Sequence, residues 1–230
     1  MKRRQFNKLI TSVSSAIVVS NGYSISRTKQ KYGLSLAQWS LNKMIKTKKT
    51  LNPINFAQKA SELGFNAIEY VSTLYRLELE KMNISELTKK LISNSKNYNI
   101  KNLLIMVDQE GDLSSSNPNE ILQAVDKHKK WIEMANELGC HSVRVNLNGE
   151  NNIEKWKDNS IIGLTKLCEF ADNINIIVEN HGGNSSNGKA LAEVIRNVNL
   201  NNCGTLPDFG NFCIKRSKKS SSPKECDIEY

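Results

Sequence analysis

The chain has 230 residues, of which 39% are hydrophobic and 24% are charged, and its formal net charge is +9. These values are ordinary for one soluble globular domain with a sizeable core. The five cysteines have no C-x-x-C spacing and so do not support a zinc ribbon, and their odd number argues against a complete disulfide framework. Apart from a small cluster at 215–219 the lysines are scattered, and no basic helix face is interleaved with aromatic residues, so we expect no nucleic-acid partner.

Residues 1–28 have the features of an export signal. Lys2, Arg3 and Arg4 precede a short, weakly apolar stretch at 9–19 that serines interrupt. This stretch is too short and too polar to span a bilayer, so we expect no stable membrane span. Paired arginines followed by Phe6 resemble the twin-arginine export signal, which predicts a periplasmic or otherwise exported protein. The alternative is a basic N-terminus without a targeting role, and the protein would then be cytoplasmic.

From residue 33 onward, short β-branched or apolar runs alternate with segments of helical period. Strands are expected at residues 33–38, 66–71, 101–107, 142–147, 174–179 and 203–207. The helices between them have clear end signals, such as the capping-box pair Asn83 and Glu86 and the terminating Gly139. The third strand has a continuous apolar run at 103–107, which is typical of a parallel sheet buried on both faces. His128 lies on an apolar helix face, and we interpret it as a core histidine rather than a ligand.

Polar side chains stand at the ends of nearly all the expected strands. They are Gln38, Glu69, Asp108, Arg144 with Asn146, Glu179 and Asp208. An open doubly wound sheet uses mainly the strand ends at its switch point, whereas a (β/α) barrel uses all of them. No G-x-G-x-x-G motif follows the first strand, which counts against a dinucleotide-binding domain. The sequence therefore predicts an α/β fold of the (β/α)8 barrel type, with about six β/α units in residues 31–214.

Two strand ends have the residue types of a metal or acid–base site. Glu179 and His181 follow the β-branched run at 174–178, and Asp208 follows the next expected strand. Each acid alone is equally compatible with a helix N-cap or a loop salt bridge. Two carboxylates on neighbouring parallel strands, however, are brought to the same end of the sheet. We therefore expect a site there.

Five segments together resemble a known family. They are 34–40, 68–71, 143–146, 178–183 and 206–211, and the resemblance covers roughly residues 31–214. These segments are similar to the sugar phosphate isomerase/epimerase superfamily, the xylose isomerase-like barrels. The resemblance implies that Glu179 and Asp208 bind a divalent metal (Mn²⁺, Mg²⁺, Co²⁺ or Zn²⁺) together with a His and a Glu on two later strands. It also implies that His181 contacts substrate rather than metal, and Asn211 stands where some relatives have a substrate-binding His.

The chemistry of this family explains the residue types. Isomerising or epimerising a ketose requires removal of a proton from the carbon beside a carbonyl, and a bound metal acidifies that proton. The resemblance implies Glu179 as the catalytic carboxylate. The expected substrate-binding residues are Gln38, Trp39, Glu69, Arg144, Asn146, His181 and Asn211. Two alternatives stay open: a non-catalytic sugar-binding barrel remnant, and an abasic-site endonuclease-like protein, for which three histidines are too few.

The C-terminal residues 215–230 read as a polar, basic tail. A complete barrel of about 250 residues would need two further β/α units, on the order of 65 residues. From the sequence we therefore expect a truncated barrel with an incomplete metal site and without isomerase activity of its own. Its first and sixth strands would be open edges, through which the chain would self-associate.

Overall fold

The structure is a computed structural model, and it describes residues 33–211, 213–216 and 226–228. The chain separates into two units, Met1–Gly33 and Leu34–Tyr230, and the fold below belongs to the second. The expected export signal at residues 1–28 lies outside the described residues. Within the described part of the chain, no helix combines the length and the apolar character needed to cross a membrane.

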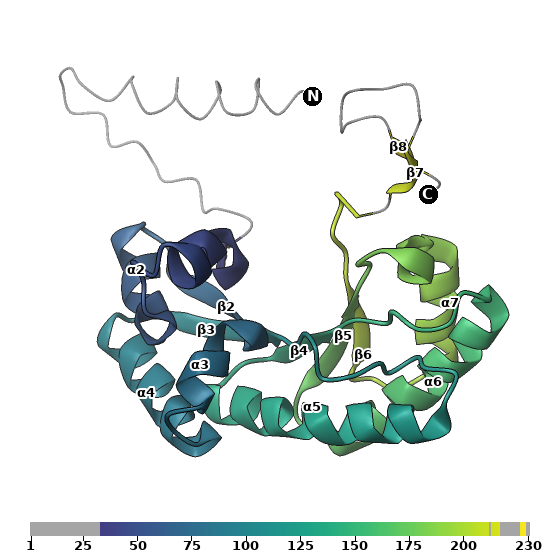
Figure 1. Ribbon diagram of the computed structural model, residues 1–230, viewed down its shortest axis with the longest axis horizontal. Coiled ribbons are helices and arrows are strands. Elements are labelled where there is room, and N and C mark those ends of the chain that lie inside the picture. The colour runs from purple at the N-terminus through teal and green to yellow at the C-terminus, as the bar shows by residue number, and fades with distance from the viewer. Residues whose placement is uncertain (1–32, 212, 217–225, 229–230) are drawn as a thin grey trace. The chain divides into compact units, whose positions relative to one another are not determined.

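Six parallel strands form one sheet in the order of the sequence, β1-β2-β3-β4-β5-β6 (Figure 1). Their bounds are β1 Leu36–Ala37, β2 Ala67–Val71, β3 Lys101–Met106, β4 Ser142–Val145, β5 Asn175–Glu179 and β6 Cys203–Leu206. The order never reverses, so this sheet has no switch point and is of the barrel type rather than doubly wound. The prediction of six barrel-type β/α units is confirmed. The first strand is shorter than predicted because the chain turns at Gln38 into the 3₁₀ helix η1, Gln38–Leu41.

Helices connect each strand to the next. The main ones are α2 Phe56–Glu62, α4 Ile84–Asn97, α5 Pro118–Leu138, α6 Ile153–Phe170 and α7 Gly188–Val198. Shorter helical segments are η2 Lys43–Thr47, η3 Pro53–Asn55, η4 Ser72–Tyr75, α3 Arg76–Leu79 and η5 Gly183–Ser186. The end signals act as predicted: Asn83 and Glu86 form a capping box, and Gly139 ends α5 in the left-handed conformation at φ 72°. Helix α6 begins at Ile153, where the side chain of Asn152 accepts hydrogen bonds from the N–H groups of the first turn.

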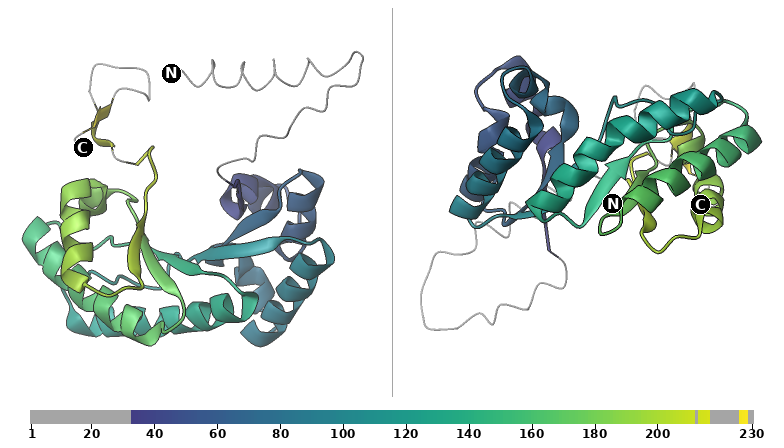
Figure 2. Two further views of the ribbon diagram at one scale, coloured as in Figure 1. Left: turned by 180° about the vertical axis from the view of Figure 1, so that it is seen from behind. Right: turned by 90° about the horizontal axis from the view of Figure 1, so that it is seen from below.

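The two faces of the sheet have different neighbours. Side chains such as Ile105, Val143 and Ile176 pack with the helices in the main hydrophobic core. The alternate residues form a smaller apolar cluster on the other face, including Leu104 and Met106. The helices α4 to α7 lie along one face of the sheet in Figure 1, and Figure 2 shows the same arrangement from behind and from below. Strand periodicity therefore decides which strand side chains point away from the helices.

Three further features of the sequence can be compared with the structure. His128 is buried at 3% exposure, and its Nδ1 lies 2.7 Å from the Ala124 carbonyl oxygen, so it is a core histidine as predicted. Cys140 and Cys168 are buried, whereas Cys203 is only partly buried. Part of the expected C-terminal tail is strand, because β7 Cys213–Arg216 pairs antiparallel with β8 Cys226–Ile228.

Candidate functional site

A cavity of about 960 Å³ lies at the C-terminal ends of the strands. Each of the six strands contributes side chains from its end or from the residues just after it. These side chains include Ala37 and Trp39, Glu69 and Val71, Met106 and Asp108, Arg144 and Asn146, Glu179 and His181, and Leu206 and Asp208. The volume is in the range of small-molecule sites, and the wall mixes apolar and charged groups. The predicted site residues are therefore brought together, with one exception.

The exception is Gln38, which does not line the cavity. Its side chain is fully buried, and its amide is committed to structural hydrogen bonds. Its Oε1 accepts a hydrogen bond from the backbone N–H of Val71 at 3.0 Å, and its Nε2 donates to the Tyr75 hydroxyl at 2.8 Å. Burial also raises the pKa of Tyr75. The expectation that Gln38 contacts substrate is not supported, because this residue joins η1 to β2 and to Tyr75 instead.

Arg144 occupies the centre of the cavity wall. Its side chain is only 5% exposed and lies between two carboxylates. Its Nη1 donates to Asp108 Oδ1 at 2.6 Å, and its Nε lies 2.9 Å from Glu179 Oε2 as an ion pair without hydrogen-bond alignment. Asn146 donates to the same Asp108 oxygen at 2.8 Å, and its own Oδ1 is buried without a partner among the described residues. The strand ends of β3, β4 and β5 are thereby joined in one charged network.

A second network joins the ends of β5 and β6. The Asn211 side chain donates to Asp208 Oδ2 at 3.0 Å and to Glu179 Oε1 at 3.4 Å, so it bridges the two predicted metal-binding carboxylates. The buried Asn180 fixes the exit of β6, because it donates to the Asp208 carbonyl and accepts from the Asp208 N–H, at 2.9 and 2.7 Å. Glu179 and Asp208 are thus held on the same wall of the cavity.

The rim of the cavity is more open. Trp39 is 51% exposed with the ammonium of Lys46 5.5 Å from its ring centre, and Phe209 is 85% exposed. Glu69 is partly buried and accepts a hydrogen bond from Ser35, and His181 is exposed. The loop that carries His181 is held by Ser185, whose hydroxyl accepts the His181 N–H at 3.0 Å. Side chains at this rim have room to adjust to a ligand.

Sequence reasoning noted Asp108 as a strand-end residue but did not assign it to the site. The cavity is also lined by Lys46, Thr73, Gln109, Asn148 and Phe209, which were not predicted. Asp108 had the same signal as Glu179, a carboxylate directly after an apolar run. Lys46 and Thr73 lie in the short helical segments η2 and η4, and the other three residues lie in loops. In such segments no periodic pattern indicates the direction of a side chain.

The chain matches the model of one protein family, described as "xylose isomerase-like TIM barrel", over residues 57–223. This match covers most of the chain. The chain belongs to the xylose isomerase-like TIM barrel family. The resemblance seen in the sequence is thereby confirmed. No curated protein matches the chain at a significant level.

Solved structures of this fold include sugar epimerases. The chain is similar to a D-tagatose 3-epimerase-like protein, with 20% identity and a TM-score of 0.62 over 79% of this chain and 66% of that one. It is also similar to the IolI protein with a bound zinc atom, with 17% identity and a TM-score of 0.60 over 76% and 62% of the two chains. A D-psicose 3-epimerase studied in the presence of D-fructose gives 14% identity and a TM-score of 0.59 over 77% and 64%. At these identities the likeness shows the fold, and the chain spans less than two thirds of the length of each structure.

The resemblance to the xylose isomerase-like family predicted metal ligands at these strand ends. Among the described residues, no group of three or more His, Cys, Asp or Glu side chains is arranged to hold a metal ion. Glu179 and Asp208 supply two carboxylates that face the same cavity and share one neighbour, Asn211. Carboxylate oxygens suit Mg²⁺ or Mn²⁺. These two carboxylates are therefore two of the four ligands that the family resemblance implies, and the Asn211 amide lies between them.

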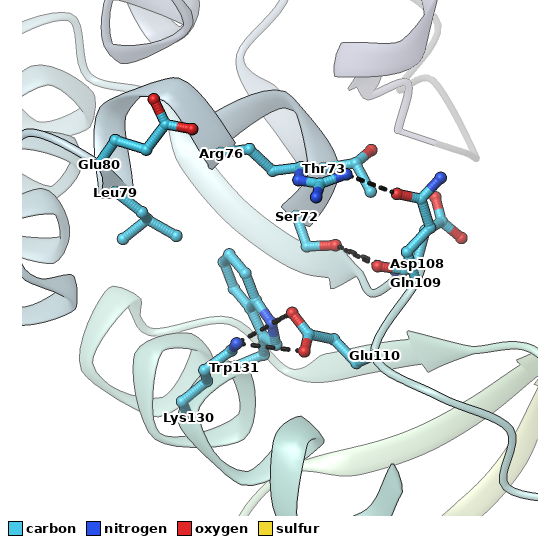
Figure 3. Close-up of a pocket in the computed structure, with 10 residues that line it drawn as sticks. All are labelled: Ser72, Thr73, Arg76, Leu79, Glu80, Asp108, Gln109, Glu110, Lys130 and Trp131. Carbon is cyan, nitrogen blue, oxygen red and sulfur yellow. Dashed lines mark hydrogen bonds and ion pairs between the residues drawn. The ribbon is translucent and has the colours of Figure 1, made fainter.

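A second cavity of about 390 Å³ adjoins the first and shares Thr73, Asp108 and Gln109 with it (Figure 3). Its charged groups are largely satisfied within the cavity wall. Lys130 lies 3.0 Å from Glu110 as an ion pair, and the Trp131 indole N–H donates to the same carboxylate at 2.8 Å. Because these charges compensate each other, we assign the candidate site to the larger cavity.

Proposed function

We propose that this chain is a sugar isomerase/epimerase-like protein whose substrate is a small ketose. The observation that supports this most is the meeting of Glu179, Arg144 and Asp208 in one cavity at the strand ends. A (β/α) barrel places its reacting groups at this end of the sheet. Structural neighbours named for D-tagatose and D-psicose epimerisation support the choice of substrate class.

The cavity offers groups that suit a sugar. The half-exposed Trp39 ring can stack against the apolar face of a pyranose or an open-chain sugar. Asn146 lines the cavity, and its side-chain amide can contact a sugar hydroxyl there. Glu69, Asn211 and the exposed His181 line the same space and are the remaining proposed hydroxyl contacts. Together these groups would orient a ketose over Glu179.

In the proposed mechanism, Glu179 removes the proton from the carbon beside the substrate carbonyl. Its carboxylate is nearly buried, which keeps water from competing for the proton. Arg144 holds one oxygen of Glu179 through the ion pair, and Asn211 approaches the other, so the carboxylate has a fixed orientation. Asp108 in turn holds Arg144. Glu179 can return the proton to the face from which it was taken, which gives back the substrate, and formation of the epimer requires a second proton donor on the opposite face of the carbon.

A divalent metal would be held by Glu179 and Asp208 on the protein side. When bound, such a metal polarises the substrate carbonyl and lowers the energy needed to remove the neighbouring proton. Binding at Glu179 and Asp208 would require the Asn211 side chain to turn away from between them. Asn211 would then be free to contact the substrate.

Hydrogen exchange at the substrate carbon tests the proposal directly. The full chain is incubated with D-tagatose, D-psicose or D-fructose in D₂O, with Mn²⁺, Mg²⁺, Co²⁺ or Zn²⁺, and deuterium at the carbon beside the carbonyl is followed by NMR. We expect exchange with the wild type and its loss with Glu179→Gln. Glu133→Gln is the matched control because Glu133 is exposed on α5 and lies outside the cavity. Exchange that survives in Glu179→Gln would contradict the role assigned to Glu179.

The second candidate function is sugar binding without catalysis. It is favoured by one observation: among the described residues no group of three or more His, Cys, Asp or Glu side chains could hold a metal, and Asn211 donates to both Glu179 and Asp208. Isothermal titration with the same three sugars separates the two functions. Binding without exchange in any metal would support the non-catalytic function, whereas the absence of both would refute each of them.

A further inference from the structure

Two cysteines lie together on the helix side of the sheet, at the opposite end of β6 from the cavity. Cys168 is in the last turn of α6, and Cys203 is the first residue of β6. The two side chains are close enough for each thiol to shift the pKa of the other. Cys168 belongs to the main hydrophobic core, and Cys203 packs against that core from its edge. The candidate site uses neither of them.

The backbone around this pair is fixed independently of the thiols. The side chain of Asn202, directly before Cys203, donates to the carbonyl oxygens of Cys168 and Ala171, both at 2.9 Å. The Cys203 N–H donates to Leu200 at 3.0 Å, and Cys203 is in register with Ile176 of β5. The end of α6 and the start of β6 are therefore held next to each other by contacts that oxidation would leave in place.

We propose that Cys168 and Cys203 form a reversible disulfide that ties α6 to β6. A low-molecular-weight disulfide such as oxidised glutathione supplies the oxidant. The partly exposed Cys203 attacks it, forms a mixed disulfide and releases one glutathione thiol. The Cys168 sulfur then attacks the Cys203 sulfur and releases the second glutathione, so that two protein thiols are oxidised and one disulfide is reduced to two thiols.

The environment of the two sulfurs matches these roles. The neighbouring Cys168 thiol lowers the pKa of Cys203, which favours the thiolate that begins the exchange. The same contact and burial raise the pKa of Cys168, so it stays protonated until its partner is modified. Accessible low-pKa cysteines beside a resolving cysteine are typical of thiols that oxidise reversibly. Cys140 is a natural control, because it is buried alone and burial raises its pKa to about 12.

The consequence of the bond is stabilisation of the β6 edge. In the described sheet, β6 pairs only with β5, and Asp208 of the candidate site follows β6 two residues after it ends. The disulfide would close a loop of about 35 residues, which restricts the unfolded chain. We expect the oxidised protein to melt higher by roughly 5–10 °C.

Peptide mapping tests the proposal on the full, folded chain. The protein is incubated with mixtures of oxidised and reduced glutathione, free thiols are alkylated, and the chain is digested with trypsin and chymotrypsin. Trypsin places Cys168 in peptide 167–189 and Cys203 in peptide 197–215, and chymotrypsin separates Cys203 from Cys213. We expect a Cys168–Cys203 cross-link that dithiothreitol removes, with Cys140 remaining a free thiol. Cys168→Ser and Cys203→Ser should each abolish both the cross-link and the rise in melting temperature, whereas Cys140→Ala should retain both.

Three results would overturn the proposal. One is that both thiols remain alkylatable in glutathione mixtures that oxidise other cysteines of the chain. Another is that Cys203 pairs with Cys213 or Cys226 in the native protein. The third is that the cross-link forms no more often in buffer than in concentrated urea, because a pair that depends on the fold must lose its preference when the chain unfolds.

Discussion

Replacing Arg144 with methionine removes the cation that two strand-end carboxylates share. Methionine is similar in length and apolar, so it fills much of the same space without a charge. Glu179, whose side chain is 11% exposed, would then be buried without its ion-pair partner, and Asp108 would lose its 2.6 Å hydrogen bond. Removing one member of a buried ion pair typically destabilises a protein by about 3–5 kcal/mol.

The exposure of Asp108 and Glu179 narrows the expected loss of stability. Asp108 is 26% exposed and can regain water, whereas Glu179 cannot. We therefore expect a loss near the lower end, about 3 kcal/mol. The double variant Arg144→Met/Glu179→Gln should recover roughly 1–2 kcal/mol of that loss, because the residue left buried is neutral. A coupling of this sign is expected only if the Arg144–Glu179 ion pair exists in the folded protein.

Urea unfolding followed by tryptophan fluorescence measures these energies, since Trp131 and Trp156 are buried. Arg196→Met is the matched control, because Arg196 is exposed in the last turn of α7, and its replacement should change the free energy of unfolding by less than about 0.5 kcal/mol. If Arg144→Met unfolds at the same urea concentration as the Arg196→Met control, the charged network does not have the energetic weight assigned to it here.

Three other predictions concern packing, pH and export. An Ala at Gly163 would force its Cβ against the Leu113 carbonyl oxygen, so Gly163→Ala should cost about 1–3 kcal/mol in urea unfolding. Gly204→Ala, whose Cβ would have its nearest contact at 3.6 Å, should cost far less. Burial lowers the pKa of His128 below 6.5, so at low pH the chain takes up a proton when it unfolds. The free energy of unfolding should therefore fall as the pH drops below about 6.5, by up to about 1.4 kcal/mol per pH unit. His128→Gln should lose this part of the pH dependence. Replacing Arg3 and Arg4 with lysine should keep the protein in the cytoplasm by cell fractionation, and unchanged delivery would refute twin-arginine routing.

The sequence was informative about the sheet because periodicity and end signals are local. The apolar run at 103–107 and the capping residues Asn83 and Gly139 placed β3 and the neighbouring helices correctly. The first strand was less well predicted. Gln38 was read as a strand-end ligand contact, yet the chain turns there and buries the side chain against Tyr75, 37 positions further along. A hydrogen bond over that separation leaves no periodic signal in either segment.

The candidate site, like the sheet, was predictable where the signal is local and not where it depends on distant contacts. Alternation along each strand explains why Glu69, Arg144 and Glu179 share the face away from the helices, and parallel pairing explains why their strands end at one level. The sequence did not predict which of them pair. Arg144 lies between Asp108 and Glu179 because the registers of β3, β4 and β5 bring the three ends together, and register follows from packing on both faces of the sheet.

The buried charge on β4 bears on function as well as on stability. An apolar residue at position 144, with neutral partners, would avoid the cost of removing a guanidinium and two carboxylates from water, and such replacements are often neutral or stabilising. The fold therefore does not need this network. What the network does is hold the Glu179 carboxylate in one orientation at the wall of a cavity large enough for a sugar. A preorganised carboxylate is what proton transfer beside a carbonyl requires, since a misplaced base loses most of its effect. A group that costs stability and fixes a reactive side chain is better explained by chemistry in the cavity than by the needs of the sheet.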